Sequence, residues 1–279
     1  MGFEFVRPLT AEAAVRLLAE TPDAVPMAGG TDLLNDLEEG RVVARRVVSL
    51  SALPWRTIDR VSDRLRLGSL VPMRQLENDP GIRRELPGLF EALHAVGGVP
   101  LRHRATLGGN LGRASPASDL LPILLALEAE VGIVGPSGAR GIALDRFLQG
   151  SRSVALDRGE LIASVGVPAS APSAYAWQRV RAANDISQVG VAVARPAPGA
   201  GWRVALGGVA PRPVRLPETE RLLGAPRPDP SALRAAAQVA EREAPFVTDR
   251  RATEAYRRRL VEVLVRRALE RAILREAPG

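Results

Sequence analysis

The chain has 279 residues, no cysteine and two histidines, and this length is sufficient for a large apolar core divided between two domains. The absence of cysteine excludes disulfides, thiolate zinc sites, cysteine-ligated iron–sulfur clusters and cysteine nucleophiles. The formal net charge of +7 comes from 38 arginines interleaved with 31 acidic residues, and aromatic residues make up only 4%, a pattern that argues against nucleic-acid binding.

The start of the chain, "MGFEFVRPLT", has no basic segment followed by an apolar stretch, so we expect no signal peptide. The longest strongly apolar run is residues 120–127, which is far shorter than the ~20 residues that span a bilayer. We therefore expect a cytoplasmic protein without a membrane-bound part.

The N-terminal segment is predicted to form a helix, a strand and a glycine turn. Thr10 is a typical helix cap, and apolar residues at helical spacing follow it until Pro22 ends the helix. The short strand "AVPM" (24–27) then leads into Gly-Gly-Thr-Asp (29–32), and a helix or turn begins at Leu33.

The middle of the chain is predicted to alternate strands and helices. We expect strands within 45–53, 64–73 and 160–168, and helices within 73–79 and 86–98. A second glycine turn precedes a helix that starts near Leu120. A strand, a turn, a second strand and a short helix then occupy residues 130–148.

The composition changes at residues 169–174, "ASAPSA", which we interpret as a domain boundary. Beyond it we expect antiparallel strands followed by two helices, at 231–243 and 252–274. The predicted class is α+β, with domains at 1–171 and 172–279 and no internal repeat.

The two glycine turns, "MAGGTDLL" and "TLGGNLG", share a plan: apolar residues, Gly-Gly, then short polar residues. Glycine permits left-handed backbone and a close approach to N–H groups, and successive N–H groups form concave anion sites. A single turn of this kind is most simply structural, but two matching turns suggest that they surround one diphosphate. The three-glycine dinucleotide pattern is absent, and a Walker A loop is excluded because the chain has no lysine.

The segment "SPASDLLP" (115–122) adds a second polar feature. Ser115 or Ser118 can cap the following helix, and capping alone is sufficient to explain them. Asp119 would repel a neighbouring phosphate, so in a nucleotide site it should accept hydrogen bonds from hydroxyls of a sugar or ribityl chain. This division of roles favours FAD over a nucleoside triphosphate.

The two histidines lack the companions that a metal site or catalytic triad requires. We therefore interpret His94 and His103 as structural, with His103 in the basic segment that leads to the second turn. No residue is predicted to be catalytic or to bind a metal.

The two glycine motifs and their spacing resemble those of a known family. "AGGTDLL", followed some seventy-five residues later by "ATLGGNLGRASPASDLLP", looks like the FAD-binding subunit or domain of the molybdenum hydroxylases, which include xanthine dehydrogenase and aerobic carbon-monoxide dehydrogenase. The segments 183–194 and 249–269 look like the same family's C-terminal domain.

The resemblance implies a two-part FAD-binding domain of the vanillyl-alcohol-oxidase type and a small α+β C-terminal domain. It also implies which residues contact non-covalently bound FAD, through the diphosphate, the ribityl or ribose hydroxyls and the ring system. These residues are Ala28, Gly29, Gly30, Thr31, Asp32, Leu33, Thr106, Leu107, Gly108, Gly109, Asn110, Ser115, Asp119 and Ile162.

The implied function is that of a flavoprotein oxidoreductase subunit of a molybdopterin-dependent dehydrogenase complex. Molybdopterin and [2Fe-2S] clusters would be carried by a large and a small partner subunit, and NAD, a quinone or oxygen would take the electrons. Two alternatives stay open: a stand-alone flavin-dependent oxidoreductase, and a scaffold that has lost its flavin. One departure from the family is that Trp177 or Gln178 stands where a lysine is frequent.

Overall fold

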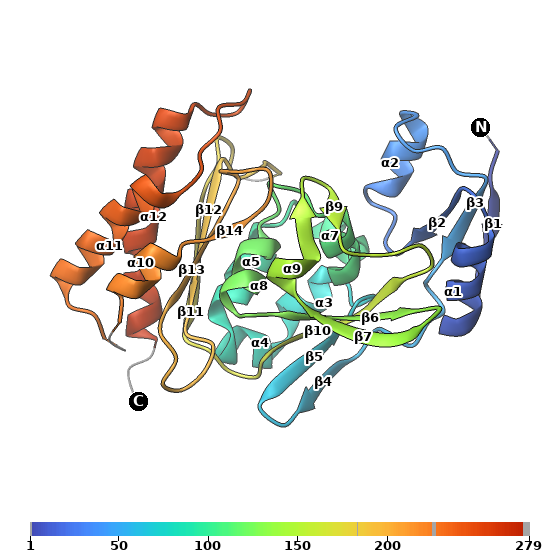
Figure 1. Cartoon of the computed structure of the whole chain (residues 1–279), viewed down its shortest axis with the longest axis horizontal. Helices are drawn as coiled ribbons and strands as arrows, with labels where there is room; N and C mark the ends of the chain where they lie inside the picture. The colour runs from blue at the N-terminus through green and yellow to red at the C-terminus, as the bar shows by residue number, and fades with distance from the viewer. Residues whose placement is uncertain (1, 183, 225–226, 276–279) are drawn as a thin grey trace.

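The computed structural model describes residues 2–182, 184–224 and 227–275, and its elements form three successive parts along the chain (Figure 1). The first part is a parallel sheet in the order β1-β3-β2, formed by Glu4–Val6, Arg46–Ser49 and Ala24–Met27. Helix α1, Ala11–Glu20, packs beside it, and the Thr10 hydroxyl accepts the Ala13 N–H at 3.2 Å, as the predicted cap requires. The short helix α2, Leu33–Glu38, stands apart from this sheet in Figure 1.

The second part is an antiparallel sheet in the order β4-β5-β10-β6-β7. Its strands are Ile58–Val61, Arg64–Gly68, Leu161–Pro168, Glu130–Gly135 and Gly138–Ala143. Around it lie the helices α3 (Met73–Asn78), α4 (Pro80–Glu85), α5 (Pro87–Ala95), α6 (Val99–Arg104), α7 (Leu107–Arg113), α8 (Leu120–Ala126) and α9 (Leu144–Phe147), together with the hairpin β8 (Leu148–Gly150) and β9 (Ser153–Val154).

The third part is an antiparallel sheet in the order β11-β12-β13-β14, with α10 to α12 on one face. Strand β12 is a continuous apolar run, "VGVAVA", because both faces of this sheet are buried. Val191 and Val193 point into the core under α11 and α12, whereas Ala192 and Ala194 point into the core of the second part. The bounds of these elements are Ser173–Gln178, Val189–Ala194, Arg203–Gly207 and Val214–Arg215 for the strands, and Pro217–Leu222, Pro230–Glu243 and Glu254–Leu274 for the helices.

These elements confirm the predicted α+β class, although one local prediction is wrong. The second Gly-Gly pair is not a turn. It lies in the first turn of α7, which Thr106 caps by accepting the Gly109 N–H at 3.1 Å. The segment 99–104 forms helix α6, an element absent from the sequence prediction; its Arg102 is buried, whereas His103 is exposed. The division of the chain at residues 171 and 172 stays a prediction, and Ala183, in one segment of the family resemblance, lies outside the described residues.

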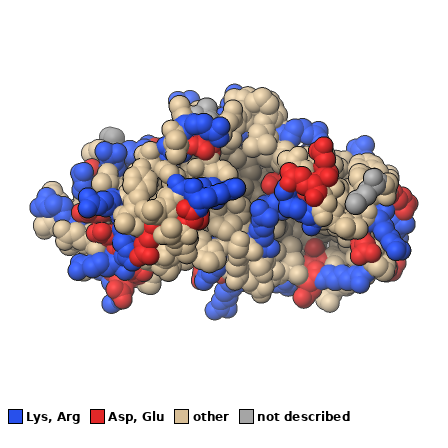
Figure 2. All heavy atoms as spheres, turned by 90° about the horizontal axis from the view of Figure 1, so that it is seen from above, with Lys and Arg blue, Asp and Glu red and all other residues tan. Residues whose placement is uncertain are grey.

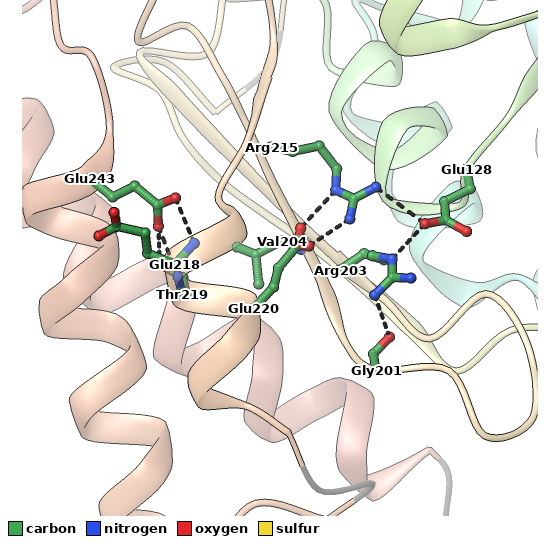
Figure 3. Close-up of polar contacts among 9 residues, drawn as sticks. All are labelled: Glu128, Gly201, Arg203, Val204, Arg215, Glu218, Thr219, Glu220 and Glu243. Atoms are coloured by element: carbon green, nitrogen blue, oxygen red, sulfur yellow. Dashed lines mark hydrogen bonds and ion pairs between the residues drawn. The ribbon is translucent and has the colours of Figure 1, made fainter.

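A polar network joins the second part to the third (Figure 3). Glu128, just after α8, accepts hydrogen bonds from Arg203 at 2.6 Å and from Arg215 at 3.3 Å. Arg215 also holds Glu220 in α10 at 2.5 Å, and Glu220 in turn accepts the Val204 N–H at 3.0 Å. One carboxylate of the second part therefore contacts two strands of the third, and Arg215 extends the network to helix α10.

Replacing Glu128 by glutamine is expected to weaken this contact in a pH-dependent way. Burial acts to raise the pKa of Glu128, but the hydrogen bond and charge of Arg203, and then Arg215, hold it below its ordinary 4.5. A carboxylate whose folded-state pKa is lowered stabilises the fold above its unfolded pKa, and this contribution is lost as the pH falls through the folded-state pKa.

Because 45% of the Glu128 side chain is exposed, the loss should stay below about 1 kcal/mol. Urea unfolding at about pH 7 and about pH 3 measures it. The variant and the wild type should differ less at the lower pH, and an equal difference at both would contradict the prediction.

Candidate functional site

A cavity of about 470 Å³ lies between the loop after β2, the end of β5 and helix α7. It is lined from both glycine motifs and from segments far from either in the sequence. All the predicted site residues line it except three, Leu107, Ser115 and Asp119. Further lining residues include Asp36, Ser69, Met73, Leu101, Gly112 and Arg113.

The first glycine motif presents unused backbone donors to this cavity. Among the described residues, the N–H groups of residues 29–33 donate to no protein acceptor. Gly30 has φ of +80°, the left-handed conformation in which successive N–H groups form a concave anion site. Loops of this kind suit phosphate oxygens. An unpaired N–H in a partly buried site costs free energy, and a hydrogen bond to an anion removes this cost.

The second glycine motif has no such donors to offer. The N–H groups of Leu107 and Gly108 donate to Val71 and Ser69 carbonyls at 3.2 and 2.7 Å. The N–H groups of Gly109 and Asn110 donate to Thr106, at 3.1 Å in each case. Its contribution to the cavity is therefore shape and side chains, whereas the first motif contributes N–H groups.

The first glycine of each pair also has a packing reason. A Cβ on Gly29 would overlap the carbonyl oxygen of Arg104, and a Cβ on Gly108 would lie 2.6 Å from the Ser69 Cβ. The Arg104 guanidinium returns a hydrogen bond to the Gly29 carbonyl at 3.4 Å. The first motif therefore packs against the end of α6, and the second packs against Ser69.

Ser69 is a cavity residue that sequence reasoning missed. It is 2% exposed, and its Oγ has no hydrogen-bond partner within the described part of the chain. A buried hydroxyl without a partner costs free energy, so a partner supplied by a bound ligand would stabilise it. No local pattern in "LGSLVPM" marks this serine, because its position depends on the packing of β5 against α7.

Asp119 and Ser115 lie away from the cavity wall. The buried Asp119 carboxylate accepts hydrogen bonds from the Tyr175 hydroxyl at 2.7 Å and the Ser187 hydroxyl at 2.6 Å, both from the third part of the chain. Burial raises the pKa of Asp119, and these two hydroxyls oppose that rise. The Ser115 hydroxyl accepts the Ala117 N–H at 3.4 Å. Their predicted contact with cofactor hydroxyls stays a prediction.

Changing Asp119 to alanine is expected to lower the free energy of unfolding by about 1–3 kcal/mol, because two buried hydroxyls lose their acceptor. Urea denaturation measures this loss. The double change of Asp119 to alanine and Tyr175 to phenylalanine is the control, and it should cost less than the sum of the two single changes. Full additivity would show that the hydroxyl bond contributes nothing.

Three other predicted positions have clear surroundings. Ile162, in β10, lines the cavity. Trp177 stacks on Tyr175, with ring centroids 5.7 Å apart, and the Arg179 guanidinium lies 5.3 Å from its ring centre. His94 Nδ1 lies 2.9 Å from the buried Glu77 carboxylate, which agrees with a structural role. Trp177 is not among the residues that line the cavity.

The charges of the molecule are dispersed. Figure 2 shows basic and acidic side chains intermixed at both ends of the upper face, which is hollowed near its middle.

Within residues 2–182, 184–224 and 227–275, no three His, Asp or Glu side chains gather as a metal site would require. In the same residues, no helix combines the length and the apolar character needed to cross a membrane.

Comparison with known proteins places the whole chain in one group. Residues 1–170 match the family described as the FAD binding domain in molybdopterin dehydrogenase, and residues 174–272 match the CO dehydrogenase flavoprotein C-terminal domain. The xanthine dehydrogenase FAD-binding subunit of Escherichia coli O157:H7 is 31% identical over 224 residues, which are 77% of each chain. The nicotine 6-hydroxylase medium subunit of Paenarthrobacter nicotinovorans is 28% identical over 253 residues, 89% of each chain.

A solved structure has the same fold. The carbon monoxide dehydrogenase from Hydrogenophaga pseudoflava, in a form that lacks the Mo-pyranopterin moiety, superposes with a TM-score of 0.90 at 28% identity. The superposition covers 99% of this chain and 98% of that one. Both the order of the three parts and their packing are therefore shared over the full length.

Proposed function

The chain belongs to the family of FAD-binding domains in molybdopterin dehydrogenases, and from that premise we propose that it is the FAD-carrying, electron-transferring subunit of a heteromeric molybdenum hydroxylase. The relatives and the solved structure come from enzymes named as dehydrogenases or hydroxylases, in which the matching chain is a medium or FAD-binding subunit. This chain has no cysteine that could hold an iron–sulfur cluster. It would be the point at which electrons leave the complex.

One observation supports this proposal most directly: the unused N–H groups of residues 29–33 form one wall of the cavity. They fit the diphosphate of FAD, because successive backbone N–H groups can bind an anion without a side-chain cation. The unpaired Ser69 hydroxyl fits a polar atom of the same ligand. Ile162, Leu101 and Met73 supply apolar surface for its rings.

When bound, FAD can accept electrons one at a time and release two together. The residues of this chain bind and orient it. The first glycine motif would hold the diphosphate, and Asn110, fixed by the Ser118 hydroxyl at 2.7 Å, would present its amide to the cavity. No side chain of the site is proposed to act as an acid, a base or a nucleophile.

The proposed partners are a large molybdopterin-binding subunit and a small iron–sulfur subunit. The medium chains among its relatives support this assignment, since a medium chain implies both a larger and a smaller one. NAD, a quinone or oxygen is the proposed final acceptor, and the cytoplasm is the proposed location.

An absorption spectrum of the purified full chain, after addition of excess FAD and desalting, tests the proposal. Bands near ~370 and ~450 nm at about one flavin per chain are expected. The same measurement with co-expressed partners follows. A chain that retains no flavin in either state would overturn the proposal, whereas flavin retained only with partners would show that they complete the site.

A further inference from the structure

The cofactor cavity has two walls that come from distant segments, and a partly buried ion pair crosses between them. One wall carries α2, on which Asp36 is only 3% exposed, and the other carries Arg113, the last residue of α7. The two residues are 77 positions apart in the sequence, and both line the cavity.

The contact is bidentate. Arg113 donates from Nη1 to one Asp36 oxygen and from Nη2 to the other, the second at 3.3 Å. Its Nε also lies 3.4 Å from an oxygen of Asp32, at the start of α2. Two parallel N–H···O bonds fix both the distance and the orientation of the partners, which a single contact cannot do.

Asp36 also contacts a second arginine, which lies on its own side of the cavity. Arg41 donates from Nε to the same carboxylate at 2.7 Å, but it belongs to the same segment as α2 and is absent from the cavity wall. Hydrogen bonds from Arg41 and then from Arg113 hold the pKa of Asp36 below its ordinary value, although burial acts to raise it. The carboxylate is therefore charged at neutral pH, as an ion pair requires.

Among the residues that the structure describes, only Arg113 makes side-chain hydrogen bonds between α2 and a segment distant in the sequence. Figure 1 shows it standing apart from the sheets, and its apolar Leu34 is 48% exposed. The loop that enters α2 carries the unused N–H groups, so any movement of α2 also moves the proposed diphosphate site. From these observations, and resting on the proposed function, we propose that Asp36 and Arg113 form a clasp that keeps the α2 segment closed over the cofactor and slows cofactor release.

The test compares FAD release from the full chain in four variants: Arg113→Gln, Asp36→Asn, the double variant, and Arg41→Gln as the matched control. Release is followed by the rise of flavin fluorescence after dilution. Loss of one partner of a buried charge pair acts mainly on dissociation, so Arg113→Gln and Asp36→Asn should each speed release roughly 10- to 100-fold. The double variant should be no faster than either single one, and Arg41→Gln should change release less than about threefold.

Two outcomes would overturn the clasp. The first is an unchanged rate of FAD release in both Arg113→Gln and Asp36→Asn. The second is faster FAD release in Arg113→Gln alone, which would show that the arginine contacts the cofactor itself.

Hydrogen–deuterium exchange of residues 33–42 in the cofactor-free chain separates this proposal from the proposed function. Opening of α2 should expose its amides, so exchange there should be faster in Arg113→Gln than in the wild type. A wild type that takes up no FAD, either alone or with co-expressed partners, would remove the proposed function, whereas equal exchange in the two proteins would remove the clasp.

Discussion

Replacing Gly112 by leucine is expected to weaken FAD binding at least ~100-fold while leaving the fold intact. Gly112 lines the cavity within α7, and a Cβ built on it would meet only Ile162 Cδ1, at 3.8 Å. The added side chain therefore enters space that the cofactor would occupy, and no backbone has to move. A hundredfold change in the dissociation constant corresponds to about 2.7 kcal/mol.

The stability of the Gly112 variant should stay equal to that of the wild type or rise slightly, because glycine is a poor residue in a helix interior. Flavin titration gives the affinity and thermal unfolding of the cofactor-free chain gives the stability. Gly112→Ala is the matched control: its single methyl lies at ordinary van der Waals distance and should cost much less affinity. Unchanged affinity in Gly112→Leu would place the cofactor elsewhere.

Replacing Arg102 by alanine is expected to destabilise the fold by about 3–5 kcal/mol, since it would remove the buried partner that makes two hydrogen bonds to a buried carboxylate. Arg102 is 3% exposed and grips Glu77 with two hydrogen bonds, of 2.8 and 3.1 Å. Its third nitrogen donates to the Val96 carbonyl at 2.8 Å. The arginine therefore ties α3 to the turn that begins α6, next to the cavity.

The charge state of Glu77 makes the Arg102 prediction specific. Burial acts to raise the pKa of Glu77, but hydrogen bonds from Arg74, His94 and Arg102 hold it below its ordinary value. Arg74→Ala is the control, because this more exposed arginine contacts the same carboxylate at 2.8 Å and its loss should cost below about 1 kcal/mol. Denaturant unfolding gives the free energy of unfolding of both variants. Equal decreases in Arg102→Ala and Arg74→Ala would show that the burial of Arg102 does not add to its stabilising effect.

Much of the fold was predictable from local patterns. The cap at Thr10, the strand before Gly29 and the helical spacing in the last long helix each depend on neighbouring residues, and each has its counterpart in the structure. The second glycine pair misled because Gly-Gly usually interrupts helices. Here Thr106 caps the helix, and Ser69 packs where a Cβ on Gly108 would lie.

The chemistry of the cavity was less accessible to sequence reasoning. Two similar glycine motifs suggested similar roles, yet only the first leaves its N–H groups unpaired, because Ser69, Val71 and Thr106 accept those of the second. The partner of Asp36 across the cavity, Arg113, is 77 residues away, and Ser69 belongs to no motif. These features depend on contacts between distant segments, which a single sequence does not reveal.

The two buried faces of the β11–β14 sheet have a consequence for how the molecule can be divided. Ala192, Ala194 and Ala205 belong to the same core as Leu121 and Leu125 of α8. A fragment that ends near residue 171 would therefore expose these leucines to water. A fragment that begins there would keep α10 to α12 on one face of the sheet but would expose the alanines of the other face to water. The two family matches, residues 1–170 and 174–272, thus lie within one unit of folding, which should melt in a single cooperative transition.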